Sequence, residues 1–89
     1  MKMSKRAKEL MAYNSMTSTS VASLAGDPVY IISEKWEIEL WGIAQQDGSV
    51  TSAIGNDRYA SDLLASDFKV YSIESVVMVD KAIAEGGAK

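Results

Sequence analysis

The sequence predicts one α+β domain in which a small antiparallel sheet of about three or four strands packs with an N-terminal helix, a short middle helix and a C-terminal helix. Residues 36–40 alternate apolar and acidic side chains, as half-buried strands do. Asp47-Gly48 is a dipeptide that tight hairpin turns prefer. Apolar residues recur at helical spacing near both ends of the chain. An apolar content of 47% in 89 residues is typical of a single compact core.

The N-terminal region predicts a basic amphipathic helix followed by a linker. In residues 3–16 apolar side chains share one helical face, at Met3, Ala7, Leu10 and Met11. Ser4 can cap this helix, because its hydroxyl accepts a free backbone N–H. Residues 15–23 are rich in Ser and Thr, which weaken regular structure, so we interpret them as a linker or a frayed turn. We therefore divide the chain into residues 1–26, the basic helix with its linker, and residues 27–89, a compact α+β body.

Two β-strand segments precede the Asp-Gly turn. Residues 29–32 form a β-branched and aromatic run, and a short connection joins them to the alternating strand. A two-residue type I′ turn at Asp47-Gly48 sets Ile43 opposite Ser52 and places Val50 and Ile54 on the same face as Ile43. This register predicts a hairpin between the second and third strands.

The alternating strand then has inconsistent parity on its two sides of Gly42. A β-bulge at Gly42 resolves the conflict, since an isolated glycine in a strand often marks one. The bulge gathers a common core face, made of Trp36, Ile38, Leu40, Ile43, Val50 and Ile54. It leaves Trp41 beside Glu37 and Glu39 on the opposite face.

The second half of the chain predicts a short helix, a strand and a final helix. Residues 58–66 carry apolar side chains at helical spacing after a Gly-Asn-Asp turn. The pattern of residues 68–80 fits either a strand or a helix, and we divide it into a strand at 68–73 and a helix at 74–85. Gly86 suits the position after a helix end, because glycine readily adopts a positive φ.

Charge and composition narrow the partner classes. Residues 1–8 carry four of the nine basic residues and none of the twelve acidic ones, so the other five basic and twelve acidic residues leave about −7 on residues 9–89. An acidic body repels phosphate, which disfavours nucleic acid as a partner. No stretch approaches the roughly 18 continuous apolar residues of a membrane span. The absence of cysteine suits a reducing compartment, and we expect a cytoplasmic protein.

The chain contains neither histidine nor cysteine, which removes the commonest general base and the soft metal ligands. We therefore expect no enzymatic activity, no catalytic residues, no metal site and no cofactor. Glu37 and Glu39 would point the same way from one strand and could hold a hard cation, but a solvated strand face is the stronger interpretation.

Two groups of residues are candidates for binding a partner. Trp41 beside Glu37 and Glu39 would be an unusual exposed surface, and tryptophan is enriched in interface centres. The basic helix offers Lys5, Arg6 and Lys8. The alternatives are that the C-terminal helix covers Trp41 and that the basic helix docks on its own domain.

The leading hypothesis is a small non-enzymatic binding protein that docks on another protein as an inhibitor, adaptor or regulator. Phages and mobile elements often encode small acidic domains of this kind to block host proteins, so such an origin belongs to the hypothesis. Two alternatives are kept: a structural, homo-oligomer-forming component with a swapped N-terminal arm, and a binder of small ligands or nucleic acid.

Overall fold

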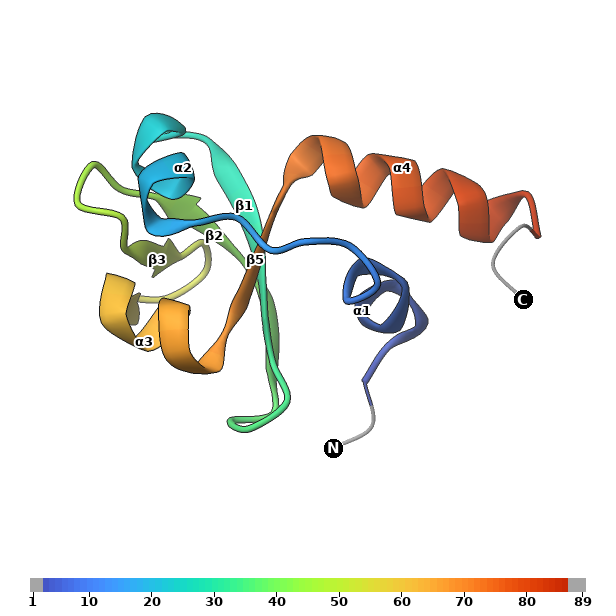
Figure 1. The fold of residues 1–89 in the computed structure, drawn as a ribbon, viewed down its shortest axis with the longest axis horizontal. Coiled ribbons are helices and arrows are strands. Elements are labelled where there is room, and N and C mark those ends of the chain that lie inside the picture. The colour runs from blue at the N-terminus through green and yellow to red at the C-terminus, as the bar shows by residue number, and fades with distance from the viewer. Residues whose placement is uncertain (1–2, 87–89) are drawn as a thin grey trace.

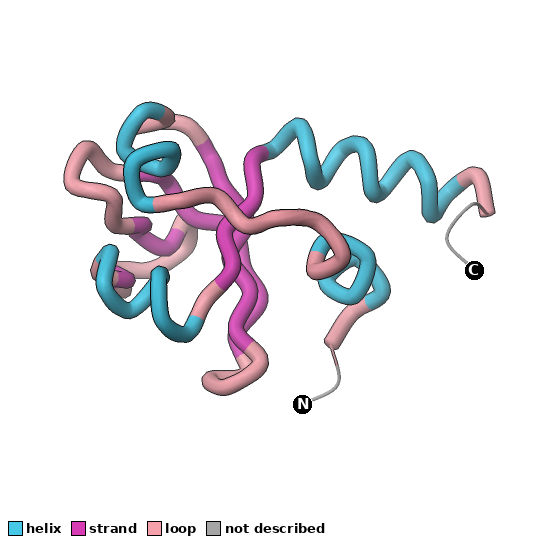
Figure 2. Tube along the Cα trace, in the orientation of Figure 1, coloured by secondary structure: helices cyan, strands magenta, loops and turns pink. Residues whose placement is uncertain are grey.

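The computed structural model describes residues 3–86, and in them the predicted α+β class is confirmed. One antiparallel sheet of five strands has the order β4-β3-β2-β1-β5, slightly more than the three or four strands that the sequence predicted. Its strands are β1 (Pro28–Ser33), β2 (Ile38–Ala44), β3 (Val50–Ser52), β4 (Arg58–Tyr59) and β5 (Lys69–Ser72). The helices are α1 (Lys5–Leu10), α2 (Ser18–Ser23), α3 (Ser61–Asp67) and α4 (Ile73–Ala84), as Figure 2 shows.

Helices cover both faces of the sheet (Figure 1). Successive residues of a strand point to opposite faces, and in β1 both sets are apolar and buried. Val29 and Ile31 belong to a first core cluster with side chains of α2 and α3, whereas Tyr30 and Ile32 belong to a second cluster with side chains of α1 and α4. The sheet is therefore the middle layer of three.

The predicted bulge at Gly42 is wrong. β1 and β2 pair without interruption from Pro28 opposite Ile43 to Ser33 opposite Ile38. Gly42 is required for another reason: a Cβ there would lie 2.3 Å from Val50 Cγ1 and 2.8 Å from the Thr51 carbonyl oxygen. Because β2 keeps its regular alternation, Ile38 and Leu40 pack against the first cluster and Trp41 against the second.

Two residues assigned to the core by the bulge are exposed instead. Trp36 lies in the turn before β2 with 53% of its surface exposed, and Ile54 lies in the loop after β3 with 95% exposed. The turn between β1 and β2 includes Glu37 at a φ of 56°, in the left-handed region that non-glycine residues rarely adopt. The β-strand therefore begins two residues later than the alternating pattern suggests.

The hairpin between β2 and β3 exists, but its predicted register is off by one residue. Gly48 has a φ of 84° and its N–H donates to the Gln45 carbonyl, while the Gln45 N–H donates to the Ser49 carbonyl. Glycine alone has a positive φ in this loop, so the turn is a three-residue loop rather than type I′. Ile43 consequently lies opposite Thr51, not Ser52.

The Ser/Thr segment is not a plain linker, because residues 18–23 form helix α2. Thr17 caps this helix by accepting the Ser20 N–H at 3.2 Å. Just before it, the chain runs along β5: the Met16 N–H donates to the Val70 carbonyl at 2.8 Å, and the Val70 N–H donates to Ser15 Oγ at 2.9 Å. This segment carries the chain from α1 on one face to α2 on the other (Figure 1).

The other helices and the last strand lie close to their predicted positions, but two of the helices are shorter than predicted. Ser4 caps α1 as predicted, but α1 spans only residues 5–10 rather than 3–16. The helix predicted at 58–66 begins at Ser61, because Arg58 and Tyr59 pair with β3. The strand and helix predicted after residue 68 are confirmed as β5 and α4, and Gly86 follows α4 with a φ of 73°.

Candidate protein-binding surface

Three of the predicted binding residues, Arg6, Glu39 and Trp41, lie together on the face covered by α1 and α4, but their contacts are internal. Arg6 on α1 makes a bidentate ion pair with Asp80 on α4, with Nε 2.8 Å and Nη2 2.6 Å from its two oxygens. The Arg6 guanidinium also lies 5.3 Å from the centre of the Tyr30 ring. Trp41 packs edge-on against that ring, with centroids 5.0 Å apart.

Glu39 holds α1 to the sheet. Its carboxylate accepts hydrogen bonds from the Tyr30 hydroxyl and from the hydroxyl and N–H of Ser4. Burial alone would raise the pKa of Glu39, but the hydrogen bonds from Ser4 and Tyr30 outweigh it and hold the pKa below its usual range. Burial, together with the bond to this carboxylate, raises the pKa of Tyr30 to about 12.

These contacts favour the alternative in which the basic helix docks on its own domain, and Trp41 is partly buried against the second cluster. Ala7 and Leu10 of α1 are fully buried in the second cluster, beside Val76 and Val79 of α4. Lys5 and Lys8 are exposed on the outer side of α1, and Glu37 lies apart in the turn. The structure therefore does not gather the six predicted residues into one open surface.

A tryptophan that the sequence assigned to the core gives a stronger candidate. Trp36 exposes 53% of its surface at the turn between β1 and β2, yet its ring is held in place. Its Nε1 donates to Asp67 Oδ2 at 2.9 Å, and Lys35 Nζ lies 5.5 Å from the ring centre. Lys35 also pairs with Asp67 at 3.5 Å, so one carboxylate fixes both neighbours.

The electrostatics of this turn keep Asp67 charged. The indole hydrogen bond of Trp36 is the main cause that lowers the pKa of Asp67 below its ordinary 3.8, and the Lys35 ammonium acts in the same direction. Asp67 is the last residue of α3. Its hydrogen bond to Trp36 therefore ties the C-terminal end of α3 to the turn between β1 and β2. The exposed indole is thereby preorganised.

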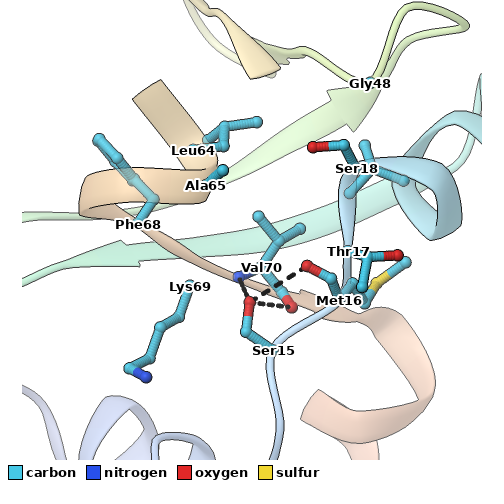
Figure 3. Close-up of a pocket in the computed structure, with 11 residues that line it drawn as sticks. Ser15, Met16, Thr17, Ser18, Gly48, Leu64, Ala65, Phe68, Lys69 and Val70 are labelled. Carbon is cyan, nitrogen blue, oxygen red and sulfur yellow. Dashed lines mark hydrogen bonds between the residues drawn. The ribbon is translucent and has the colours of Figure 1, made fainter. Parts of the chain in front are cut away.

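Two concave surfaces lie near α3, and the smaller one includes residues of this turn. A depression of about 220 Å³ includes Lys35, Asp67 and Phe68 in its lining. A larger open cleft of about 480 Å³ lies between α2, α3 and β5 (Figure 3). The two share the lining residues Ala65, Phe68 and Lys69, and the smaller one also includes Lys35, the chain neighbour of Trp36.

The larger cleft has one apolar and one hydroxylated wall (Figure 3). Leu64 of α3 and Phe68, just after α3, lie on the apolar side. The hydroxyls opposite already have structural partners, since Ser15 bonds the backbone of Val70 and Thr17 caps α2. Such a cleft can receive an apolar side chain of a partner, but it offers no free acid and base pair for chemistry.

Polar clusters elsewhere in the described residues have structural roles. Asp47 accepts from the hydroxyl and N–H of Ser49, and these bonds lower its pKa to about 2. Within residues 3–86 no group of three or more Asp and Glu side chains could hold a metal ion. In the same part of the chain, no helix is long and apolar enough to cross a membrane.

The sequence pattern did not predict that Trp36 is exposed. Trp36 fits the alternation of Ile38 and Leu40, so its pattern alone predicts a core residue. Its partner Asp67 lies 31 residues away in the chain, at the end of a different element. Comparison with models of protein families, with curated proteins and with solved structures gives no match, so the case for function depends on this geometry.

Proposed function

We propose that this chain is a small non-enzymatic protein that binds another protein, with Trp36 as the central contact. The observation that supports this most is the exposed indole: about half of the Trp36 surface is open, while Asp67 and Lys35 contact the ring and orient it. An anchor that is already ordered loses little side-chain entropy on binding. Tryptophan is also among the residues that contribute most to interface affinity.

The surroundings of Trp36 fit a protein partner. The cleft between α2, α3 and β5 has Phe68 and Leu64 in its lining, and an apolar side chain of a partner can pack there. Lys35, Lys69, Glu34 and Asp67 give the depression nearest the ring a mixed polar lining. Mixed charge of this kind suits a folded protein surface better than a phosphate backbone, which requires an excess of positive charge.

A binding protein of this size can act as an inhibitor, adaptor or regulator by covering a surface of its target. The non-enzymatic part of the proposal draws support from the paired state of the carboxylates at Asp80, Glu39, Asp67 and Asp47, each of which holds two structural elements or a turn together. The pKa values of Glu39, Asp47 and Asp67 are lowered, whereas a general acid at neutral pH requires a raised one.

The test is affinity capture from the native host with the wild-type chain and three variants. The affinity of each form for each captured protein is then measured. Trp36→Ala should weaken binding by more than about 30-fold, the loss expected of an interface hot spot. Asp67→Ala should weaken it less, because the indole stays but loses its fixed orientation. Ile54→Ala is the matched control, since it removes an exposed apolar side chain from a different loop, and it should bind normally.

If no captured protein depends on Trp36, the proposal is overturned at this site. Equal losses for Trp36→Ala and Ile54→Ala would contradict it as well, because they would indicate a non-specific apolar contact. Circular dichroism of each variant should show an unchanged fold.

A further inference from the structure

Helix α4 is apolar on two sides, which is unusual for a surface helix. Val76 and Val79 are buried against α1 and the sheet. On the outer side Ile73, Val77 and Met78 expose 45%, 59% and 49% of their surface. A helix that is apolar all round is normally buried all round. In Figure 1, α4 extends away from the sheet with α1 along one side of it only.

The outer face of α4 carries one acidic and one basic residue at equal distances from its centre. Glu74 lies one turn before the Val77-Met78 pair and Lys81 one turn after it, and both are exposed. Neither side chain takes part in an ion pair within residues 3–86. The exposed Ile73 lies at one end of this stretch and the exposed Ala82 at the other.

We propose that a second copy of this chain docks on the outer face of α4, with the two α4 helices antiparallel about a twofold axis between Val77 and Met78. This arrangement sets Val77 opposite Met78 of the second copy and Ile73 opposite Ala82. It also sets Glu74 opposite Lys81, twice per dimer. A twofold interface must be self-complementary, and this face is complementary to itself in both apolar contacts and charge.

The interface is small, because a helix of 12 residues is about 18 Å long. Contacts of this size bury less than a standard stable interface, so the dimer is weak and exchanges with monomer. The overall charge of −3 on each copy opposes association at long range. Dimer formation therefore depends on protein concentration, which makes the two states accessible in one experiment.

The proposal does not depend on the role of Trp36, which lies at the turn beside α3. Sedimentation equilibrium over a concentration series up to the millimolar range is the primary measurement. The wild-type chain should shift from monomer to dimer mass as concentration rises. Val77→Glu should stay monomeric throughout, with an unchanged thermal midpoint because Val77 is exposed. Ile54→Glu, the same change at another exposed apolar residue, should dimerise as the wild type does.

Charge reversal tests the antiparallel register. Glu74→Lys alone or Lys81→Glu alone sets like charges opposite each other, and each should weaken dimerisation about tenfold. The double variant, Glu74→Lys with Lys81→Glu, should restore it. The double variant is also the least favourable for the α4 dipole, so rescue cannot come from a more stable helix.

A wild-type chain that remains monomeric at millimolar concentration would overturn the proposal. Equal disruption by Val77→Glu and Ile54→Glu would do the same, because the contact would then lie elsewhere. A double charge reversal no better than the single ones would rule out the antiparallel register.

Discussion

The two faces of the sheet are built in different ways, although β1 contributes to both. The first face is closed by α2 and α3, which come from the interior of the chain, and its core cluster is apolar. The second face is closed by α1 and α4, which come from opposite ends of the chain, and it contains a polar network around Tyr30. A short chain can thus bury both faces of one sheet, but the second face requires its two ends to meet.

The largest effect should come from removing residues 1–16. This deletion takes away Ala7 and Leu10, which are fully buried, together with the Arg6 ion pair to Asp80. Each buried leucine lost costs about 2–5 kcal/mol, and a domain of this size has a total stability of roughly 5–10 kcal/mol. The truncated chain should lose its cooperative urea transition, measured by circular dichroism. A cooperative transition that survives the deletion would contradict this and would show that the remaining chain folds without α1.

On the first face, Gly42→Ala should cost about 1–3 kcal/mol, because the new Cβ would overlap Val50 Cγ1 and the Thr51 carbonyl. In a Val50→Ala background the cost of Gly42→Ala should be smaller, since one of the two clashing groups is already absent. Gly55→Ala is the matched control, because the nearest atom to its Cβ would be Ser52 Oγ at 3.6 Å. A Gly42→Ala chain as stable as the control in urea denaturation would contradict the regular pairing of β2.

Trp41 lies on the second face and Trp36 in the exposed turn, so substitutions at the two positions should differ in their effect on stability. Trp41→Ala should cost about 2–3 kcal/mol because the ring is partly buried against Tyr30, whereas Trp36→Ala should cost under about 1 kcal/mol. Iodide should quench the fluorescence of the Trp41→Phe chain, which keeps Trp36, more strongly than that of the Trp36→Phe chain. The reverse order of quenching would contradict both placements.

The ion pair that joins the chain ends should have a measurable coupling energy. A double-mutant cycle with Arg6→Met and Asp80→Asn should give about 1 kcal/mol, since the pair is bidentate but 34% and 40% exposed. Salt at 1 M should reduce this value. The same cycle at Arg58 and Asp47, which are 56% and 55% exposed, should give a smaller coupling energy. Equal coupling energies at the two sites would show that the Arg6–Asp80 pair contributes no more than an exposed surface pair.

The smallest effect concerns pH. Burial and the bond to Glu39 raise the pKa of Tyr30 to about 12 from an ordinary 10. The folded state therefore favours the neutral phenol, so this stabilisation is complete below pH 10 and is lost as the pH rises from 10 to 12. Ultraviolet absorbance of tyrosinate, compared between wild type and Tyr30→Phe, should show one tyrosine titrating near 12. Titration of Tyr30 near 10 would show that the network is open to solvent.

Local patterns predicted those elements whose signals lie within a few residues. The apolar run of β1, the cap at Ser4, the strand and helix after residue 68 and the glycine at 86 were predicted correctly from neighbouring residues. The helix at residues 18–23 was missed, because Thr17 as a cap outweighs the weak helix propensity of the serines that follow.

The errors arose where a residue's role depends on distant contacts. Gly42 suits a bulge by local criteria, but the clash that requires a glycine involves Val50 on the next strand. Trp36 has the parity of a core residue, yet the left-handed Glu37 ends the alternation and Asp67 holds the ring outside. Glu39 and Trp41 were correctly placed on one face, but only the folded chain shows that α1 covers it.

The segment that passes along β5 also has a consequence for aggregation. An uncovered strand edge is a template for cross-β pairing between molecules. At β5 the outward N–H and carbonyl of Val70 are already bonded to Ser15 and Met16. The other edge strand, β4, is only two residues long. Lateral strand addition, the first step toward amyloid, is thus blocked at one margin by the protein's own chain and limited at the other by the shortness of the strand.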